Sequence, residues 1–172
     1  NVFIAQVDHD KVVKILDFGI AKVLDHRTVT VDGEIVGSAR YMSPEQVVGA
    51  KDIDLRSDLW SLGVILYRAV TGSDAFGGDI VETMQSIRCG RFSPATITRP
   101  DLVPEVDAFF DRALAFDRKR RFLSAVEMAD AFAEVAERQV AATSQAEAEP
   151  PVGTDERVAT ATLVQTVTPT VI

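Results

Sequence analysis

The sequence has 172 residues, of which 47% are hydrophobic and 26% are charged, with 10 glycines and 7 prolines. This composition is typical of a globular domain and is too apolar for a wholly disordered chain. The 18 Lys and Arg residues against 26 Asp and Glu residues give a formal net charge of −8. That charge argues against sequence-independent binding to nucleic acid, because such binding needs a basic surface.

The chain has one cysteine, Cys89. It excludes an intrachain disulfide framework and a cysteine-rich zinc site, and it favours a reducing compartment. The most apolar run, residues 59–67, lies between Asp58 and Arg68 and is too short to span a bilayer. The sequence opens with Asn1 rather than Met, directly in a strand-like run, and we expect part of the protein to precede it.

The first elements in chain order are two short runs rich in β-branched residues, at residues 2–5 and 12–16, joined by a polar turn. They predict a β-hairpin. Residues 17–37 show no hydrophobic period and predict a long loop, a type of segment that is usually functional in compact domains. Ser43 followed by Pro44 then predicts the start of a short helix.

Two further helices are predicted in the middle of the chain. Residues 57–71 are apolar nearly all round and end at Gly72, which predicts a helix buried inside a domain. Asp79 and Glu82 form a capping-box pattern that opens the next helix.

The last two predicted helices lie before a change in composition. One begins near Pro104, and the other opens with a capping box at Ser124 and fades near Val140. The remaining sequence is built of Ala, Thr, Val, Pro and Glu without an aromatic residue, and it buries too little surface to offset its chain entropy. We therefore divide the chain into a folded domain at residues 1–140 and a disordered linker at residues 141–172.

Five short segments follow one another in a distinctive order on these elements. They are Asn1 at the head of the first strand, Asp17-Phe18-Gly19 after the hairpin, residues 37–45 (GSARYMSPE), residues 58–63 (DLWSLG, which include Trp60), and Asp117 with Arg121 and Phe122. In this order the chain resembles the protein kinase family, specifically the eukaryotic-like serine/threonine kinases of bacteria. The resemblance covers residues 1 to about 140. It implies an α+β fold of which this chain holds the mainly α-helical C-terminal lobe with one small β-hairpin.

The resemblance implies two metal ligands and an ATP site. Asp17 matches the aspartate that holds Mg²⁺ on the ATP phosphates, and Asn1 matches the asparagine that binds a second Mg²⁺. A hairpin that begins at Asn1 and ends at Asp17 brings both ligands to the same end. Phe3 matches the apolar floor beneath adenine, with an ordinary core aromatic as the alternative. Phe18 and Gly19 match the pivot on which the following loop switches between active and inactive arrangements.

Other residues are assigned to the substrate side. Thr28 and Thr30 are candidate phosphorylation sites that could order the loop by pairing with arginines, and a simply solvated loop is the alternative. Ser38 stands where serine/threonine kinases usually have the threonine that faces the substrate hydroxyl.

The resemblance also implies structural roles. Glu45 and Arg121 match an ion pair that links the end of the loop to the helical core. Asp58 stands at a helix start, where it can accept backbone N–H bonds and, in the family, anchors the catalytic loop. The alternative for Asp58 is a plain N-terminal helix charge.

The resemblance implies a signalling enzyme that uses ATP and two Mg²⁺ ions to phosphorylate serine or threonine in protein substrates. A pseudokinase that serves as a scaffold or ATP-binding module is the alternative. The glycine-rich loop, the phosphate-pairing lysine and the general-base aspartate would all precede Asn1, so we predict no activity for residues 1–172 alone. We expect a cytoplasmic location, with the linker leading to a membrane anchor or sensor domain downstream.

Overall fold

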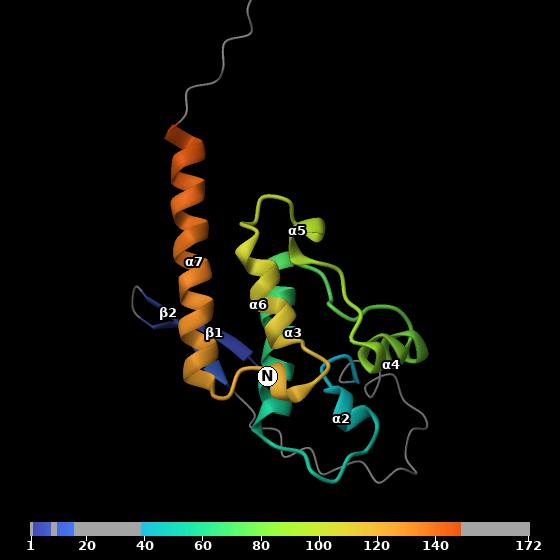
Figure 1. Ribbon diagram of the computed structural model, residues 1–172. Helices are drawn as coiled ribbons and strands as arrows, with labels where there is room; N and C mark the ends of the chain where they lie inside the picture. Colours follow the sequence, from blue (N-terminus) through green and yellow to red (C-terminus); the bar gives the residue numbers. More distant parts are fainter. Residues whose placement is uncertain (1, 8–9, 16–38, 149–172) are drawn as a thin grey trace, which may run out of the picture.

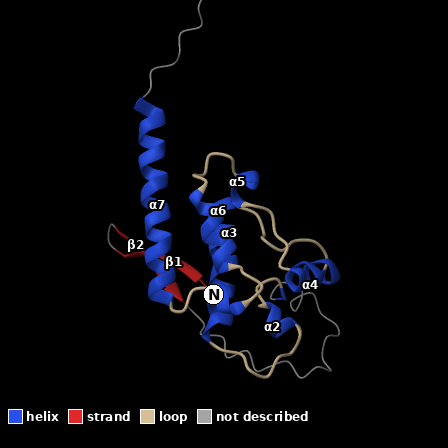
Figure 2. Cartoon of the chain, in the orientation of Figure 1, coloured by secondary structure: helices blue, strands red, loops and turns tan. Residues whose placement is uncertain are grey.

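A computed structural model describes residues 2–7, 10–15 and 39–148 of the chain. The two strands, β1 (Val2–Val7) and β2 (Asp10–Ile15), form an antiparallel hairpin in which Val2 pairs with Ile15 and Val7 with Asp10. The predicted hairpin is confirmed, and both strands extend further into the turn than predicted. The other regular elements of the described chain are all helices, joined by loops (Figure 2).

The central helix of the body is α3 (Leu55–Thr71), which follows the short α2 (Pro44–Val47). α3 begins two residues earlier than predicted because Asp54, not a later residue, is its N-cap and accepts a hydrogen bond from the Arg56 backbone N–H at 2.9 Å. It ends where predicted, at Gly72, which takes the left-handed conformation (φ 75°). Leu62, on the side of α3 that faces away from the core, is 38% exposed, so α3 is not buried all round.

Three helices follow α3 in the chain, and they are α4 (Ile80–Cys89), α5 (Ala95–Thr98) and α6 (Glu105–Ala113). Helix α6 runs alongside α3, α5 lies near the C-terminal end of α3, and α4 lies beside α2 (Figure 1). The predicted capping box of α4 is present, because the Asp79 carboxylate accepts from the Glu82 backbone N–H at 2.9 Å while Glu82 accepts from the Asp79 backbone N–H at 3.2 Å. The single turn α5 was not predicted from the sequence. Thr96 fixes it by donating to Asp107 of α6 from both its backbone N–H, at 3.1 Å, and its hydroxyl, at 2.5 Å.

The chain continues through a short 3₁₀ turn, η1 (Arg118–Arg120), into α7 (Ala125–Ala148). The sequence placed the end of this helix near Val140 and assigned residues 141–148 to the linker. The structure corrects that boundary, since these eight residues are the last turns of α7. They are mostly Ala, Gln and Glu, which have high helix propensity. Residues 149–172, the rest of the predicted linker, lie outside the described part.

The hydrophobic core is built around α3. Trp60 stacks on Phe76 with a ring separation of 5.4 Å, and Tyr67 packs edge to face on Phe110 at 5.1 Å. Gly63 lets α3 approach α6 closely, because a Cβ there would lie 3.1 Å from the Cβ of Ala113. Within the described ranges, no helix is both long and apolar enough to cross a membrane.

Candidate functional site

The segment from Ala39 to Val47 is attached to α3 by hydrogen bonds at two points. The Ser61 hydroxyl donates to the Tyr41 carbonyl at 2.9 Å, and the Ser57 hydroxyl donates to Glu45 Oε1 at 2.5 Å. At the start of α2, the Ser43 backbone N–H donates to the Gln46 side chain at 2.8 Å, as expected for a cap residue placed before Pro44. This segment directly follows Ser38 in the chain, so α3 fixes the residues next to the candidate substrate-side hydroxyl.

Glu45 and Arg121, which the resemblance pairs, meet in a bidentate ion pair. Arg121 Nη1 lies 2.8 Å from Glu45 Oε1, and Nη2 lies 2.9 Å from Oε2. The Arg121 side chain is fully buried and the Glu45 side chain is 10% exposed. Two parallel N–H···O bonds give the pair both strength and a fixed orientation.

The remaining donors of Arg121 are also satisfied. Its Nε donates to the Ala115 carbonyl at 2.8 Å, and its Nη atoms donate to the carbonyls of Arg56 and Phe116 at 3.1 and 3.2 Å. The guanidinium carbon lies 4.7 Å from the centre of the Trp60 ring. A buried arginine with every donor satisfied is a structural connection between segments far apart in the chain.

The carboxyl of Glu45 titrates abnormally. Burial alone would raise its pKa, but the hydrogen bonds from Arg121 and Ser57 outweigh burial and lower the pKa to about 2. Glu45 therefore carries its negative charge at neutral pH.

Asp58 lies at a helix start as expected, but it does not accept the backbone N–H bonds expected of it in the described part of the chain. Asp58 lies in the first turn of α3 and is exposed, and its carboxylate makes no hydrogen bond to any residue in the described ranges. The backbone N–H acceptor at this helix start is Asp54, whose pKa is lowered mainly by hydrogen bonds from Arg56. The charge in the first turn is in place, and its partner in the catalytic loop stays a prediction.

A second charged cluster contains residues that sequence reasoning missed. Asp74, in the turn after α3, pairs with Arg40 through Oδ2 and with Arg68 through Oδ1, the latter at 2.6 Å. We call Arg40, Asp74 and Arg68 the arginine cluster. Its members are 6 to 34 residues apart, and the sequence carries no spacing signal that could have joined Arg40 to the other two.

Most of the predicted catalytic residues lie outside the described part of the chain. These are Asn1, Asp17, Phe18, Gly19, Thr28, Thr30 and Ser38. Phe3 is on β1, opposite Lys14 of β2, and only its backbone is described. The pairing of Val2 with Ile15 shows that the first residue of β1 and the last residue of β2 lie together. These two positions are the neighbours, one and two residues away in the chain, of Asn1 and Asp17.

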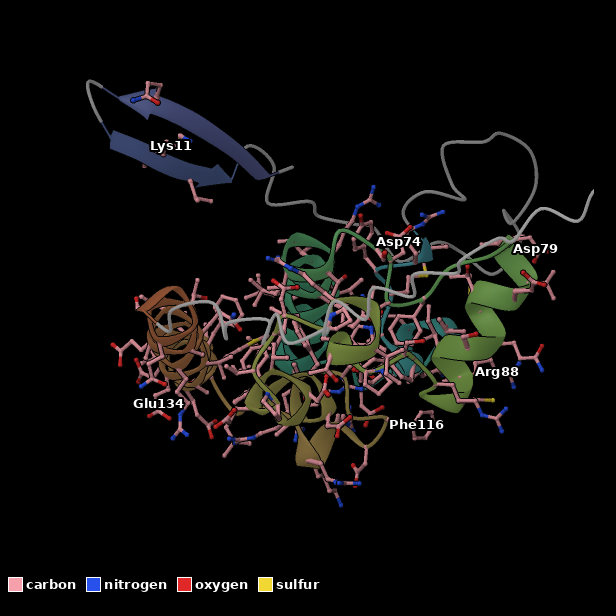
Figure 3. All side chains as sticks on the ribbon, turned by 90° about the horizontal axis from the view of Figure 1, so that it is seen from above. Lys11, Asp74, Asp79, Arg88, Phe116 and Glu134 are labelled. Atoms are coloured by element: carbon pink, nitrogen blue, oxygen red, sulfur yellow. The ribbon has the colours of Figure 1, made fainter. Side chains whose placement is uncertain are left out.

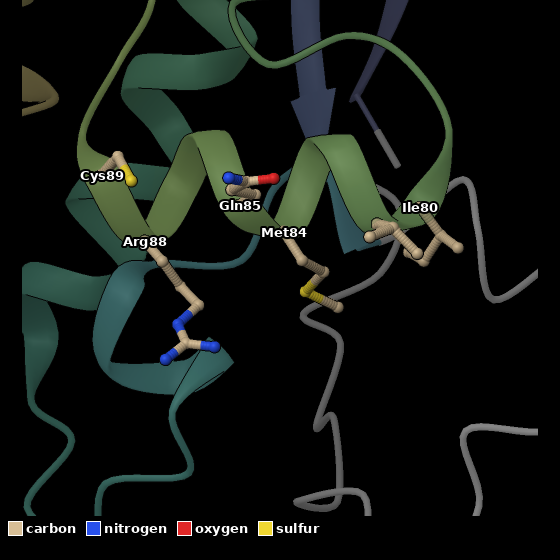
Figure 4. A pocket seen from close by; sticks show the side chains of 6 residues that line it. Ile80, Met84, Gln85, Arg88 and Cys89 are labelled. Atoms are coloured by element: carbon tan, nitrogen blue, oxygen red, sulfur yellow. The ribbon is translucent and has the colours of Figure 1, made fainter.

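A hollow of about 700 Å³ lies on one face of α4. Figure 4 shows its lining side chains, which all come from α4: Ile80, Val81, Met84, Gln85, Arg88 and Cys89. The hollow contains no carboxylate and none of the motif residues, so it is not part of the candidate site.

Comparison with known proteins gives consistent results. Residues 1–132 match the family model described as protein kinase domain. The chain is 37% identical over 126 residues to serine/threonine-protein kinase PknB of Mycolicibacterium smegmatis, a match that covers 71% of this chain and 20% of PknB. It is 40% identical over 125 residues to serine/threonine-protein kinase PknA of Mycobacterium tuberculosis, covering 72% of this chain and 28% of PknA.

Two further matches are to proteins whose names do not describe bacterial serine/threonine kinases. Tyrosine-protein kinase MasK of Myxococcus xanthus is 38% identical over 120 residues, covering 69% of this chain and 18% of MasK. Among solved structures, the twitchin kinase region from C. elegans matches with a TM-score of 0.46 and 25% identity, covering 50% of this chain and 15% of that one. The matched region spans only a fifth to about a quarter of the length of the curated relatives.

Proposed function

Since this chain belongs to the protein kinase domain family, we propose that it is part of a serine/threonine kinase that transfers the γ-phosphoryl group of ATP to hydroxyl groups of protein substrates. The observation that carries the proposal is the closed ion pair of Glu45 and Arg121, which holds the segment after Ser38 on α3. The choice of serine/threonine over tyrosine rests on Gly37-Ser38 before Tyr41. It is supported by the names of PknB and PknA and opposed by that of MasK.

The donor set fits a pair of Mg²⁺ ions. Asn1 offers an amide oxygen and Asp17 a carboxylate, and hard oxygen ligands of this kind suit Mg²⁺. The pairing of Val2 with Ile15 supports a common location for these two ligands at one end of the hairpin. When bound, Mg²⁺ neutralises charge on the ATP phosphates during transfer.

The chain's own residues then have distinct tasks. Asn1 and Asp17 hold the metal ions, Phe3 lies beneath adenine, and Phe18 with Gly19 allows Asp17 to move in and out of place. Ser38 faces the substrate hydroxyl. The Glu45–Arg121 pair touches no reacting atom, and it positions the segment that carries Ser38.

The test is phosphorylation of a generic basic protein by the full-length protein with Mg²⁺ and ATP, followed by identification of the modified amino acid. We expect phosphoserine and phosphothreonine, and we expect Asp17→Asn to lower turnover about 10²-fold or more, because charge developing in transfer loses its stabilisation. Asp111→Asn is the matched control, since Asp111 is an exposed aspartate of α6 whose side chain makes no hydrogen bond to a described residue. ATP binding without phosphate transfer would instead establish a pseudokinase.

We also propose a cytoplasmic location for this domain, with residues 149–172 leading to a membrane anchor or sensor domain. The support is compositional: a single cysteine and a polar tail without aromatic residues. Residues 1–172 expressed alone are expected to give no turnover, and cell fractionation of the full-length protein tests the location.

A further inference from the structure

The arginine cluster carries more positive than negative charge. Two guanidinium groups, those of Arg40 and Arg68, share the single carboxylate of Asp74. Their formal charges leave the cluster at +1, in a chain whose overall charge is −8. A local cationic spot on an acidic protein favours an anionic partner at that place.

Both arginines have unused hydrogen-bond donors. Arg40 Nε is buried and has no partner among the described residues. Arg68 makes one side-chain hydrogen bond in the described part of the chain, to Asp74, and its side chain is 52% exposed. A guanidinium presents five N–H donors in a fixed fork that matches a carboxylate or phosphate, so the exposed donors of Arg68 can bind a second anion alongside Asp74.

The cluster is also next to the segment expected to face the substrate. Arg40 is two residues after Ser38, and Asp74 ties it to the end of α3. Figure 3 shows Asp74 on the side of the helical body where the hairpin lies, with Lys11 next to the hairpin's turn. Asn1 and Asp17 adjoin the other end of the hairpin in the chain. A peptide whose hydroxyl meets Ser38 would pass within a few residues of Arg40.

We propose that the arginine cluster selects protein substrates with an acidic side chain close to the phosphorylated serine or threonine. This inference rests on the proposed kinase function. The acidic side chain binds the exposed donors of Arg68, while Asp74 holds the guanidinium groups of Arg68 and Arg40 apart and oriented. Arg40, Asp74 and Arg68 are thus specificity-determining residues that take no part in the chemical step.

The experiment measures kcat/KM of the full-length protein on a series of peptides. Each peptide has one serine that accepts the phosphate, and Glu or Lys is placed in turn at each position around that serine. The wild type is expected to prefer Glu over Lys at one position by about five- to tenfold, mainly through KM. Arg68→Glu is expected to reverse that preference at the same position and leave the others unchanged. Arg138→Glu is the matched control, because Arg138 of α7 forms a similar exposed ion pair with Glu105 of α6. It should keep the wild-type preference.

Other outcomes are equally informative. If Arg68→Glu does not fold, Arg68→Gln is expected to abolish the preference without reversing it. A wild type that phosphorylates peptides without any preference for Glu overturns this inference and leaves the proposed function intact, whereas no phosphate transfer to any peptide overturns both. The cluster could also bind a phosphate on the protein's own loop. In that case the effect of Arg68→Glu would vanish in a Thr28→Ala, Thr30→Ala background, and the inference would be wrong.

Discussion

Two charged clusters hold the same stretch of chain, and they differ in balance and burial. Glu45 and Arg121 match one carboxylate to one guanidinium, with every arginine donor satisfied and the arginine fully buried. The arginine cluster has one carboxylate for two guanidinium groups, and its side chains are 22% to 52% exposed. A closed, neutral pair stabilises a fold, whereas an open cluster with surplus charge is suited to recognition.

The largest expected difference between the two clusters is in stability. Arg121→Met leaves the buried Glu45 carboxylate without a cationic partner, and we expect it to lower the free energy of unfolding by about 3–5 kcal/mol. Arg118→Met is the matched control on the neighbouring 3₁₀ turn. Because Arg118 pairs with an exposed carboxylate, that of Asp52, its loss should cost about 1 kcal/mol or less.

Urea unfolding of the full-length protein measures both variants. The double variant Glu45→Gln, Arg121→Met should recover part of the lost stability, because no buried charge remains unpaired. Equal losses for Arg121→Met and Arg118→Met would show that burial does not separate the two pairs.

The next expected effect is a pH dependence of the closed pair. The pKa of Glu45 is lowered from 4.5 to about 2 in the folded protein. Its stabilising contribution is therefore complete above pH 4.5 and is lost as the pH falls from 4.5 towards 2, by about 3 kcal/mol in total. Other carboxyls with lowered pKa values, among them Asp54, contribute to the same acid sensitivity, so the measurement is the difference between the wild type and Glu45→Gln. If the two unfolding curves keep the same separation from pH 6 to pH 2, the ion pair does not control the titration of Glu45.

The sequence predicted features that depend on neighbouring residues better than contacts between distant residues such as those of the two clusters. The hairpin, the helix ending at Gly72 and the capping box at Asp79 depend on neighbouring residues, and all three are present. At the Asp54 cap and at the last turns of α7 only helix ends moved, whereas the single turn α5 was missed altogether.

Contacts between distant residues were predictable only where a motif carried them. Glu45 and Arg121 are 76 residues apart, and only their places in the kinase-like motifs associated them. No sequence motif associates Arg40 with Asp74, so only the structure shows that these two residues form an ion pair. The candidate catalytic residues, Asn1 and Asp17 among them, remain sequence predictions.

A smaller effect is expected when the anion of the open cluster is removed. Asp74→Asn leaves Arg40 and Arg68 without a carboxylate and raises the formal charge of the cluster from +1 to +2. The free energy of unfolding should change by about 1 kcal/mol or less, because the pairs are partly exposed. The kcat/KM for a peptide with Glu at the preferred position should rise about two- to fivefold. An unchanged preference for Glu, together with a large loss of stability, would make this cluster structural like the first.

The smallest expected effect comes from salt, which separates the two clusters without any substitution. Raising the ionic strength from about 0.1 M to about 1 M shortens the Debye length from ~10 Å to ~3 Å, which screens exposed charges and leaves buried ones almost unaffected. The preference for Glu over Lys in peptide substrates should therefore fall about two- to threefold, because the peptide meets Arg68 at the surface. The stability difference between the wild type and Arg121→Met should stay constant over the same range, since the Arg121 side chain is fully buried. A peptide preference that resists salt while the Arg121→Met difference shrinks would reverse the assignment of the two clusters.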